Sequence, residues 1–314
     1  MALESLADQV QNLNLQEAEC LPFHPTEDTQ RTLETLDDTP RYLFRVFTPL
    51  SYGATDQNWA KSMDARNATT DCKTDIFTRV DKHKVARMID RHLRWQEGRS
   101  DNLVSWTTSL LFALVYVFHL RANTRNRSTF SDIQLCILDT TCFPKRVFLR
   151  DMALVRAYKP FHSKLEDFEV LRSKKHQSLS GSFYFGEYLS QGALKIKDKC
   201  QVVSAQAILD QGLYSLLPEF EIFAHWKAQP RPPWANQVIE LREKIYFNVV
   251  GWQAMRDDGL QAAVNISKLF EQRWRMPMVI NLIAILPHQS DATDIVLLSR
   301  NFTGMPPTVK IMLN

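Results

Sequence analysis

Glycine-rich nucleotide-binding loops and several catalytic signature motifs are missing from this sequence. Its 314 residues include only 9 glycines, which form neither the G-x-G-x-x-G turn of Rossmann folds nor the G-x-x-x-x-G-K-[ST] loop of P-loop enzymes. The H-E-x-x-H, G-x-S-x-G and EF-hand patterns are also absent. Rossmann, P-loop, zincin and serine-hydrolase proteins therefore have no support from the sequence.

Cysteine is sparse, and no signal peptide is recognisable. The 5 cysteines lie far apart, without a C-x-x-C pair or the Cys/His spacing of zinc sites. They are Cys20, Cys72, Cys136, Cys142 and Cys200. An odd number of isolated cysteines predicts free thiols in a reducing compartment and no disulfide. The first residues are acidic and amide-rich where a signal peptide needs a basic and then an apolar run, so we expect a cytoplasmic or nuclear protein.

Long apolar runs and an excess of one charge are missing as well. The most apolar stretches, 109–118 and 276–287, are shorter than the roughly 20 residues that cross a bilayer, so we expect buried helices and no membrane association. Lys and Arg (38) nearly balance Asp and Glu (35) along the chain. Because charges spread in this way concentrate no field on a nucleic-acid backbone, nucleic acid is not an expected partner.

The hydrophobic pattern predicts a mixed α/β (α+β) protein. Some segments carry apolar residues at helical spacing, and others are continuously aromatic or β-branched. The predicted strands are 41–47, 102–106, 133–141, 187–196 and 200–205. The predicted helices are 81–96, 109–121, 149–158, 235–250, 252–274, 277–286 and 292–301. We expect the helices 81–96 and 109–121 to pack on a sheet that contains 41–47 and 133–140, and a hairpin to form around Lys197-Asp198-Lys199.

Three regions follow from this pattern. Residues 1–39 are polar, with one short amphipathic stretch, and are predicted to form a loosely attached N-terminal extension. Residues 40–228 hold the predicted strands and form the core region. Beyond a proline cluster at 230–233 only helical patterns follow, so 229–314 is predicted to be an all-helical C-terminal region.

Three short segments carry the residues of greatest chemical interest. Arg45 lies inside YLFRVF, Ser105 and Thr107 lie in SWTTSLLFA, and Glu187 opens a strand within FGEYLSQGAL. In this order the segments resemble the three signature strands of the Arg-Ser-Glu class of ADP-ribosyltransferases. The resemblance implies a split sheet core flanked by helices, and an enzyme that consumes NAD as a substrate. The chain also resembles a large family of fungal proteins known only as a domain of unknown function.

The resemblance gives each of these residues a role that agrees with the chemistry of NAD cleavage. Positive charge develops on the ribose as the nicotinamide bond breaks, and the carboxylate of Glu187 would stabilise it. The guanidinium of Arg45 would grip the pyrophosphate with two parallel hydrogen bonds. Ser105 and Thr107 share one side of a strand, with Trp106 on the other, and would donate to Glu187 and hold the ribose.

The aromatic run before Glu187 bears on the cofactor and on the acceptor. Phe183, Tyr184 and Phe185 provide rings that could stack on the nicotinamide, so Tyr184 and Phe185 are candidate cofactor-binding residues. Arginine-modifying members of the resembled class have Glu or Gln two residues before the catalytic glutamate, where this chain has Phe185. The acceptor therefore stays open between a protein residue, a small molecule and water.

Structural roles compete with each of these functional ones. Arg45 also fits a structural arginine paired with a carboxylate, and Ser109 fits a helix cap. Asp139 ends a strand, where functional carboxylates and turn-initiating residues both occur. The basic run that begins at Arg172 fits a solvated loop or a phosphate-attracting one. The second hypothesis for the whole chain is a catalytically silent scaffold of the same fold that binds an unknown protein partner.

Overall fold

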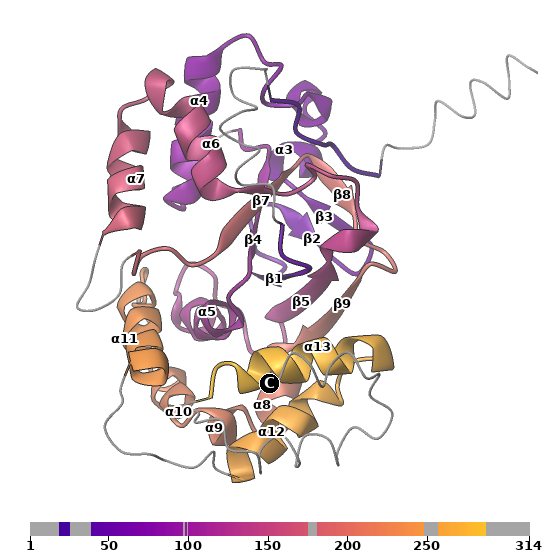
Figure 1. Cartoon of the computed structure of the whole chain (residues 1–314), viewed down its shortest axis with the longest axis vertical. Helices are drawn as coiled ribbons and strands as arrows, with labels where there is room; N and C mark the ends of the chain where they lie inside the picture. The colour runs from indigo at the N-terminus through magenta and orange to yellow at the C-terminus, as the bar shows by residue number, and fades with distance from the viewer. Residues whose placement is uncertain are drawn as a thin grey trace, which may run out of the picture.

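The computed structural model describes residues 19–25, 39–96, 98, 100–174, 181–247 and 257–286, with 246 and 247 described by their backbone alone. Two antiparallel sheets and two groups of helices form the described molecule (Figure 1). The large sheet has the order β6-β7-β4-β1-β5-β9, and the small sheet has the order β2-β3-β8. The α+β class predicted from the sequence is confirmed.

The strands of the large sheet are β1 (Tyr42–Phe47), β4 (Leu103–Thr107), β5 (Gln134–Asp139), β6 (Leu149–Arg150), β7 (Glu187–Gln191) and β9 (Cys200–Ser204). Those of the small sheet are β2 (Ala54–Thr55), β3 (Trp59–Lys61) and β8 (Ala193–Lys195). Alternate side chains of the large sheet enter different cores, as the two-residue repeat of a strand requires. Phe44 packs toward α5 and the C-terminal helices, whereas Leu43 packs toward the small sheet.

The helices divide into two groups. The first comprises α3 (Met63–Arg66), α4 (Lys82–Leu93), α6 (Asp151–Tyr158) and α7 (Lys164–Ser173). The second comprises α5 (Leu110–Ala122), α8 (Ala205–Asp210), α9 (Leu213–Leu216), α10 (Glu219–Ala224), α11 (Ala235–Phe247), α12 (Asp257–Ser267) and α13 (Gln272–Ile283). In Figure 1 the first group lies above the sheets and the second lies below them. The candidate site lies where α4 and α7 meet the large sheet.

Helices α4 and α5 each begin directly after a capping side chain. The Asp81 side chain accepts a hydrogen bond from the backbone N of Lys84 at 2.8 Å, and α4 starts at the next residue. The Ser109 side chain accepts from the backbone N of Phe112 at 3.1 Å, so the predicted helix cap is confirmed. Both helices pack on the sheet that contains β1 and β5, as expected.

Two predictions about the strands are wrong. Residues 50–74, where the pattern predicts neither strand nor helix, contain β2, β3 and α3, and β2 and β3 form the small sheet with the distant β8. The predicted hairpin around 197–199 does not form, because β8 pairs with β3 and β9 pairs with β5. Gly192, with φ of +66°, separates β7 from β8 and lets the chain turn from one sheet to the other.

Described segments near both ends of the chain pack against the rest of the molecule. Phe23 is fully buried, and its backbone N donates to the carbonyl of Arg146 at 2.9 Å. Helices follow one another from Ala205, before the proline cluster, and one hydrophobic core joins α5 to α11, α12 and α13. The amphipathic stretch within 1–18, residues 252–256 and the predicted helix 292–301 lie outside the described residues.

The lengths of the helices and the state of the cysteines bear on two further predictions. No helix in the part of the chain that the structure describes is long and apolar enough to cross a membrane. All five cysteines, for which no disulfide is predicted, are free thiols in the structure.

Replacing Gly186 with alanine should destabilise the protein more than the same change at Gly181. Both glycines have a left-handed φ, +69° and +67°, which costs an L-residue about 1–2 kcal/mol. At Gly186 an added Cβ would also lie 2.1 Å from Thr108 Oγ1, whereas at Gly181 the nearest atom is 3.5 Å away. Urea denaturation should show an additional loss of about 1–3 kcal/mol for Gly186→Ala, from overpacking. Equal losses for the two variants would contradict this account of the turn before β7.

Candidate functional site

Four side chains form a continuous hydrogen-bonded chain at the large sheet. Asp101 Oδ2 lies 2.7 Å from His92 Nδ1, and His92 Nε2 lies 2.8 Å from Ser105 Oγ. The Ser105 hydroxyl donates to Glu187 Oε1 at 2.8 Å. His92 comes from the last turn of α4, Asp101 precedes β4, Ser105 lies within β4 and Glu187 opens β7. His92 and Ser105 are only 13 residues apart, with Asp101 between them, whereas Glu187 is 82 residues from Ser105 and becomes its neighbour only through the fold.

The register of β4 and β7 explains why Ser105 reaches Glu187. Ser105 is paired with Leu189 and Thr107 with Glu187, so Ser105 and Glu187 are diagonal neighbours on adjacent strands. Diagonal neighbours lie within reach of long side chains. Trp106 points to the opposite face, where its Nε1 donates to Ser190 Oγ at 2.9 Å, as the alternation predicted.

Arg172 holds the other end of the Glu187 carboxylate. Its Nη2 donates to Glu187 Oε2 at 2.7 Å, its Nη1 donates to the Phe183 carbonyl at 2.6 Å, and its Nε lies 3.2 Å from Asp151 Oδ2. Arg172 is in the last turn of α7 and buried, not in a solvated loop as one interpretation of the basic run had it. Burial raises the pKa of Asp151 to about 7, against the opposing pull of Arg172 and with help from the charge of Glu187.

His92 is surrounded by charges that favour its protonated form. Burial by itself lowers the pKa of His92, but the charge and hydrogen bond of Asp101, together with the charge of Glu187, outweigh burial and the opposing charge of Arg45. The net shift of the pKa is upward. When Ser105 donates to Glu187, both ring nitrogens of His92 must donate, one to Asp101 and one to Ser105, which requires the imidazolium.

Arg45 lies in β1, which has only one register pair with β4, Phe44 with Thr107. Its Nη1 donates to the Ser105 carbonyl at 2.8 Å, and its Nε donates to Thr55 Oγ1 at 3.1 Å. Burial lowers the pKa of Arg45. The guanidinium forms no ion pair with a described carboxylate, so the structural-pairing interpretation has no partner within the described chain.

Tyr116 of α5 adds a hydroxyl near this guanidinium. Burial raises the pKa of Tyr116 to about 12, and the charges of Arg45 and Glu187 act on it in opposite directions. The hydroxyl makes no hydrogen bond with any residue that the structure describes. Within the described chain, a cation without a carboxylate partner and a hydroxyl without a hydrogen bond thus lie close to the chain of hydrogen bonds.

The remaining candidate residues have structural contacts. Thr107 Oγ1 donates to the Phe185 carbonyl at 2.7 Å, the Tyr184 hydroxyl accepts from Arg150 Nε at 2.7 Å, and Phe185 is packed in the core against Phe112. The structure therefore brings Arg45, Ser105 and Glu187 together. Thr107, Tyr184 and Phe185 instead contact neighbouring residues of the fold.

Asp139 lies away from these residues and starts a turn. Its Oδ1 accepts from the backbone N of Thr141 at 3.0 Å, and its Oδ2 accepts from Arg41. The helical turn Thr140–Cys142 follows, so the turn-initiating role accounts for this residue.

Sequence reasoning missed His92, Asp101 and Asp151, and it considered Arg172 only as part of a loop. One usable signal was present for His92, which continues the apolar helical spacing of 85, 88 and 89 and so places a titratable ring on the buried face of α4. Asp101, Arg172 and Asp151 carry no such signal, because charged residues next to loops and helix ends are common.

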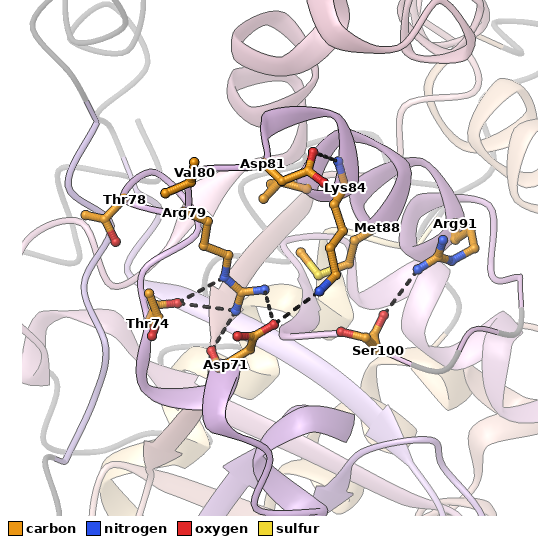
Figure 2. A pocket seen from close by; sticks show the side chains of 11 residues that line it. Asp71, Thr74, Thr78, Arg79, Val80, Asp81, Lys84, Met88, Arg91 and Ser100 are labelled. Carbon is orange, nitrogen blue, oxygen red and sulfur yellow. Dashed lines mark hydrogen bonds and ion pairs between the residues drawn. The ribbon is translucent and has the colours of Figure 1, made fainter.

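A cavity lies against α4 and is lined by residues between Asp71 and Ser100 (Figure 2). Its volume is about 330 Å³, and one wall is a face of α4 that bears Lys84, Met88 and Arg91. A smaller cavity of about 20 Å³ shares Met88 and Arg91 and reaches Asp101. Neither cavity is lined by Ser105 or Glu187. No cluster of His, Cys, Asp and Glu that could hold a metal ion occurs among the described residues.

The fold and these contacts define an α+β protein with a buried chain of charged and polar groups that joins α4, β4, β7 and α7. Residues 38–194, half of the chain, match the family described as Domain of unknown function (DUF7587), and the chain belongs to that family. The matched segment contains every residue of the site from Arg45 to Glu187. No curated protein and no solved structure matches the chain.

Arg172→Met should destabilise the protein strongly, because it leaves the carboxylates of Asp151 and Glu187 buried without a cation. Removing one partner of a buried ion pair costs about 3–5 kcal/mol. The double variant Arg172→Met/Asp151→Asn should recover part of this loss, since one of the two uncompensated charges is then gone. Chemical denaturation of the two variants measures both values. A loss below about 1 kcal/mol for Arg172→Met, the range of a surface ion pair, would show that Arg172 does not hold these carboxylates.

The raised pKa of His92 predicts a defined pH dependence of stability. The folded state binds the His92 proton more tightly than the unfolded state, in which the pKa is about 6.5. The stabilisation is therefore fully present below about pH 6.5 and is lost as pH rises through the folded-state pKa. As the pH rises from about 6.5 through the folded-state pKa of His92, the free energy of unfolding of the wild type should fall relative to that of His92→Gln, as measured by urea denaturation at each pH. His83→Gln is the matched control, because His83 is on the same helix and its ring binds the Phe161 carbonyl.

Proposed function

We propose that this chain is an NAD-consuming enzyme of the ADP-ribosyltransferase type, which transfers ADP-ribose or hydrolyses NAD through an oxocarbenium-like ribose. Glu187 stabilises the developing cation on the ribose, Ser105 orients Glu187, and Arg45 binds the phosphates. The observation that carries the proposal is the direct connection of these three residues through two hydrogen bonds, from Arg45 to the Ser105 carbonyl and from the Ser105 hydroxyl to Glu187.

The order of strands supports this assignment. β1, β4 and β7 carry Arg45, Ser105 and Glu187, and they are consecutive neighbours in the large sheet. The ribose next to nicotinamide and the pyrophosphate are adjacent groups of NAD, so their binding residues should also be adjacent. The single register pair between β1 and β4 also agrees with the split sheet that the resemblance implies.

Arg45 and Tyr116 support the binding of an anion. Taking a charge out of water is unfavourable unless the charge is paired, and Arg45 has no carboxylate partner among the described residues. Phosphate oxygens would satisfy the guanidinium, and the nearby hydroxyl of Tyr116 can donate to the same group. The lack of a carboxylate partner for Arg45 within the described chain is therefore explained if the pyrophosphate of NAD binds it.

The geometry of Asp101, His92 and Ser105 also resembles the arrangement of a nucleophilic serine with its base, which favours acyl transfer as a second candidate. The position of Glu187 argues against that reaction. Its carboxylate lies 2.8 Å from Ser105 Oγ and would repel the oxyanion that forms when a serine attacks a carbonyl group. The same carboxylate would attract a cationic ribose, so NAD cleavage is the better fit.

A catalytically silent scaffold is the remaining alternative, and Arg172 is the observation that favours it. The ion pair between Arg172 and Glu187 already neutralises the carboxylate that would face the ribose. A carboxylate that has to share its charge in this way stabilises a second cation less well. Measurement of NAD binding and nicotinamide release on the purified chain separates the enzyme from the scaffold.

Glu187→Gln should abolish nicotinamide release and leave NAD binding largely intact. The charge of Glu187 matters most when the ribose becomes cationic, so the loss should fall on turnover and exceed about 100-fold. Nicotinamide release and calorimetric NAD titration measure the two effects, and thermal denaturation checks the fold. Glu169→Gln is the matched control, because Glu169 forms ion pairs with Arg156 and Lys159 near the surface.

Arg45→Met supplies the complementary result. It should weaken NAD binding at least as much as turnover, since Arg45 is assigned to the phosphates in both the ground state and the transition state. Equal turnover in wild type and Glu187→Gln would contradict the role of Glu187. A wild-type protein that neither binds NAD nor releases nicotinamide would leave the scaffold interpretation.

A further inference from the structure

We propose that the acceptor of the ADP-ribosyl group is water, and that Ser105, His92 and Asp101 form a relay that takes the proton of this water from Glu187. The inference rests on the proposed function and adds to it the acceptor and three positioning groups. It starts from three successive contacts, from Glu187 to Ser105, from Ser105 to His92 and from His92 to Asp101, none longer than 2.8 Å.

Two arrangements of protons form the same three hydrogen bonds between Glu187, Ser105, His92 and Asp101. In the first, imidazolium His92 donates to Asp101 and to Ser105, and Ser105 donates to an ionised Glu187. In the second, protonated Glu187 donates to Ser105, Ser105 donates to neutral His92 Nε2, and Nδ1 still donates to Asp101. The two arrangements contain the same number of protons and differ by a concerted shift of two of them. A proton placed on Glu187 can therefore move to His92 without any movement of heavy atoms.

A water acceptor makes use of this property. The C1′–N bond of NAD breaks, and neutral nicotinamide leaves with the bonding electron pair. The water oxygen then forms a bond to C1′ of the cationic ribose, and its proton passes to Glu187 and on through Ser105 to neutral His92. The products are ADP-ribose and nicotinamide, and the proton on His92 returns to solvent before the next turnover. No oxidant, reductant or metal is needed for the balance.

The other carboxylates near Glu187 are already engaged, which favours a neutral acceptor over a cationic one. Asp151 is fully buried against Arg172, and Asp101 is bound to His92. Neither is left to bind an incoming guanidinium or ammonium group. Water needs no such counter-charge, but it has to lose a proton as it attacks, and the relay provides a place for that proton.

The charges around His92 set the pH at which the relay works. Asp101 and Glu187 favour the imidazolium, and Arg45 across the site opposes it. Arg172 and Asp151 act on His92 only through Glu187, which they hold from α7 and α6. Because the relay can accept a proton only when His92 is neutral, turnover should rise with pH as His92 loses its proton. Stability should change in the opposite direction over the same interval.

The test combines a titration of His92 with the pH profile of NAD hydrolysis. The Cε1–H signal of His92 is assigned by its loss in His92→Gln and followed by NMR in wild type and in Asp101→Asn. Nicotinamide and ADP-ribose are measured against pH for wild type, His92→Gln and His83→Gln. We expect His92 to titrate above its ordinary pKa, Asp101→Asn to lower that pKa, and wild-type turnover to rise with pH at the same point.

His92→Gln should lose this pH step and fall in turnover by about 10²-fold or more, the usual contribution of a general base, with little change in KM. His83→Gln should match the wild type. An unchanged pH profile in His92→Gln, with NAD still consumed, would overturn the relay and leave the proposed function standing.

The acceptor is tested separately with agmatine, a small guanidine, added to the reaction. ADP-ribose should remain the main product, and formation of ADP-ribosyl-agmatine in excess over ADP-ribose would overturn the water acceptor. Absence of nicotinamide release at every pH would overturn both the proposed function and this acceptor. The NMR titration would still decide whether His92 and Asp101 form a charged pair, so the two failures can be told apart.

Discussion

The buried carboxylate of Glu187 is the group on which the arrangement of this molecule depends. A carboxylate with 8% of its residue surface exposed has to be paired and hydrogen-bonded, because burying an isolated charge is too unfavourable. One oxygen accepts from Ser105 and the other from Arg172. These two contacts fix the relation of β7 to β4 on one side and to α7 on the other, and so they join the large sheet to the upper group of helices.

The C-terminal helices hold the segment that precedes Glu187, although they lie outside the residues that match the family. Arg242 of α11 donates to the carbonyls of Tyr184 and Ser182, and Trp234 at the start of α11 packs against Phe185. These contacts fix the aromatic segment that leads into Gly186 and Glu187. The helical region is therefore part of the core that shapes the site, because its side chains and those of α5 form a single hydrophobic cluster.

The charged groups of the site lie close together around Ser105 and His92. Glu187 and Asp101 lie on either side of Ser105 and His92, while Arg172 and Arg45 lie at the edges. Such an arrangement is more favourable for a cation that develops beside Glu187 than for an anion on Ser105. It also makes proton position and stability interdependent, since the imidazolium that stabilises the fold is the form that cannot accept a further proton.

Local sequence determined the elements whose signals are local. The aromatic and β-branched run of β1, the Asp81 and Ser109 caps of α4 and α5, and the alternation that separates Ser105 from Trp106 all follow from neighbouring residues. The strands that carry Arg45, Ser105 and Glu187 were predicted for the same reason.

Tertiary structure alone decided which strands pair and which charges meet. β8 and β9 are adjacent in sequence but join different sheets, because the pairing energy comes from distant partners, β3 and β5. Arg172 sits in a basic run typical of a solvated loop, yet packing of α7 brings it to two buried carboxylates. His92 meets Asp101 and Ser105 only because α4 ends against β4. The long-range placement of a charge depends on the packing of whole elements, which no local pattern of residues encodes.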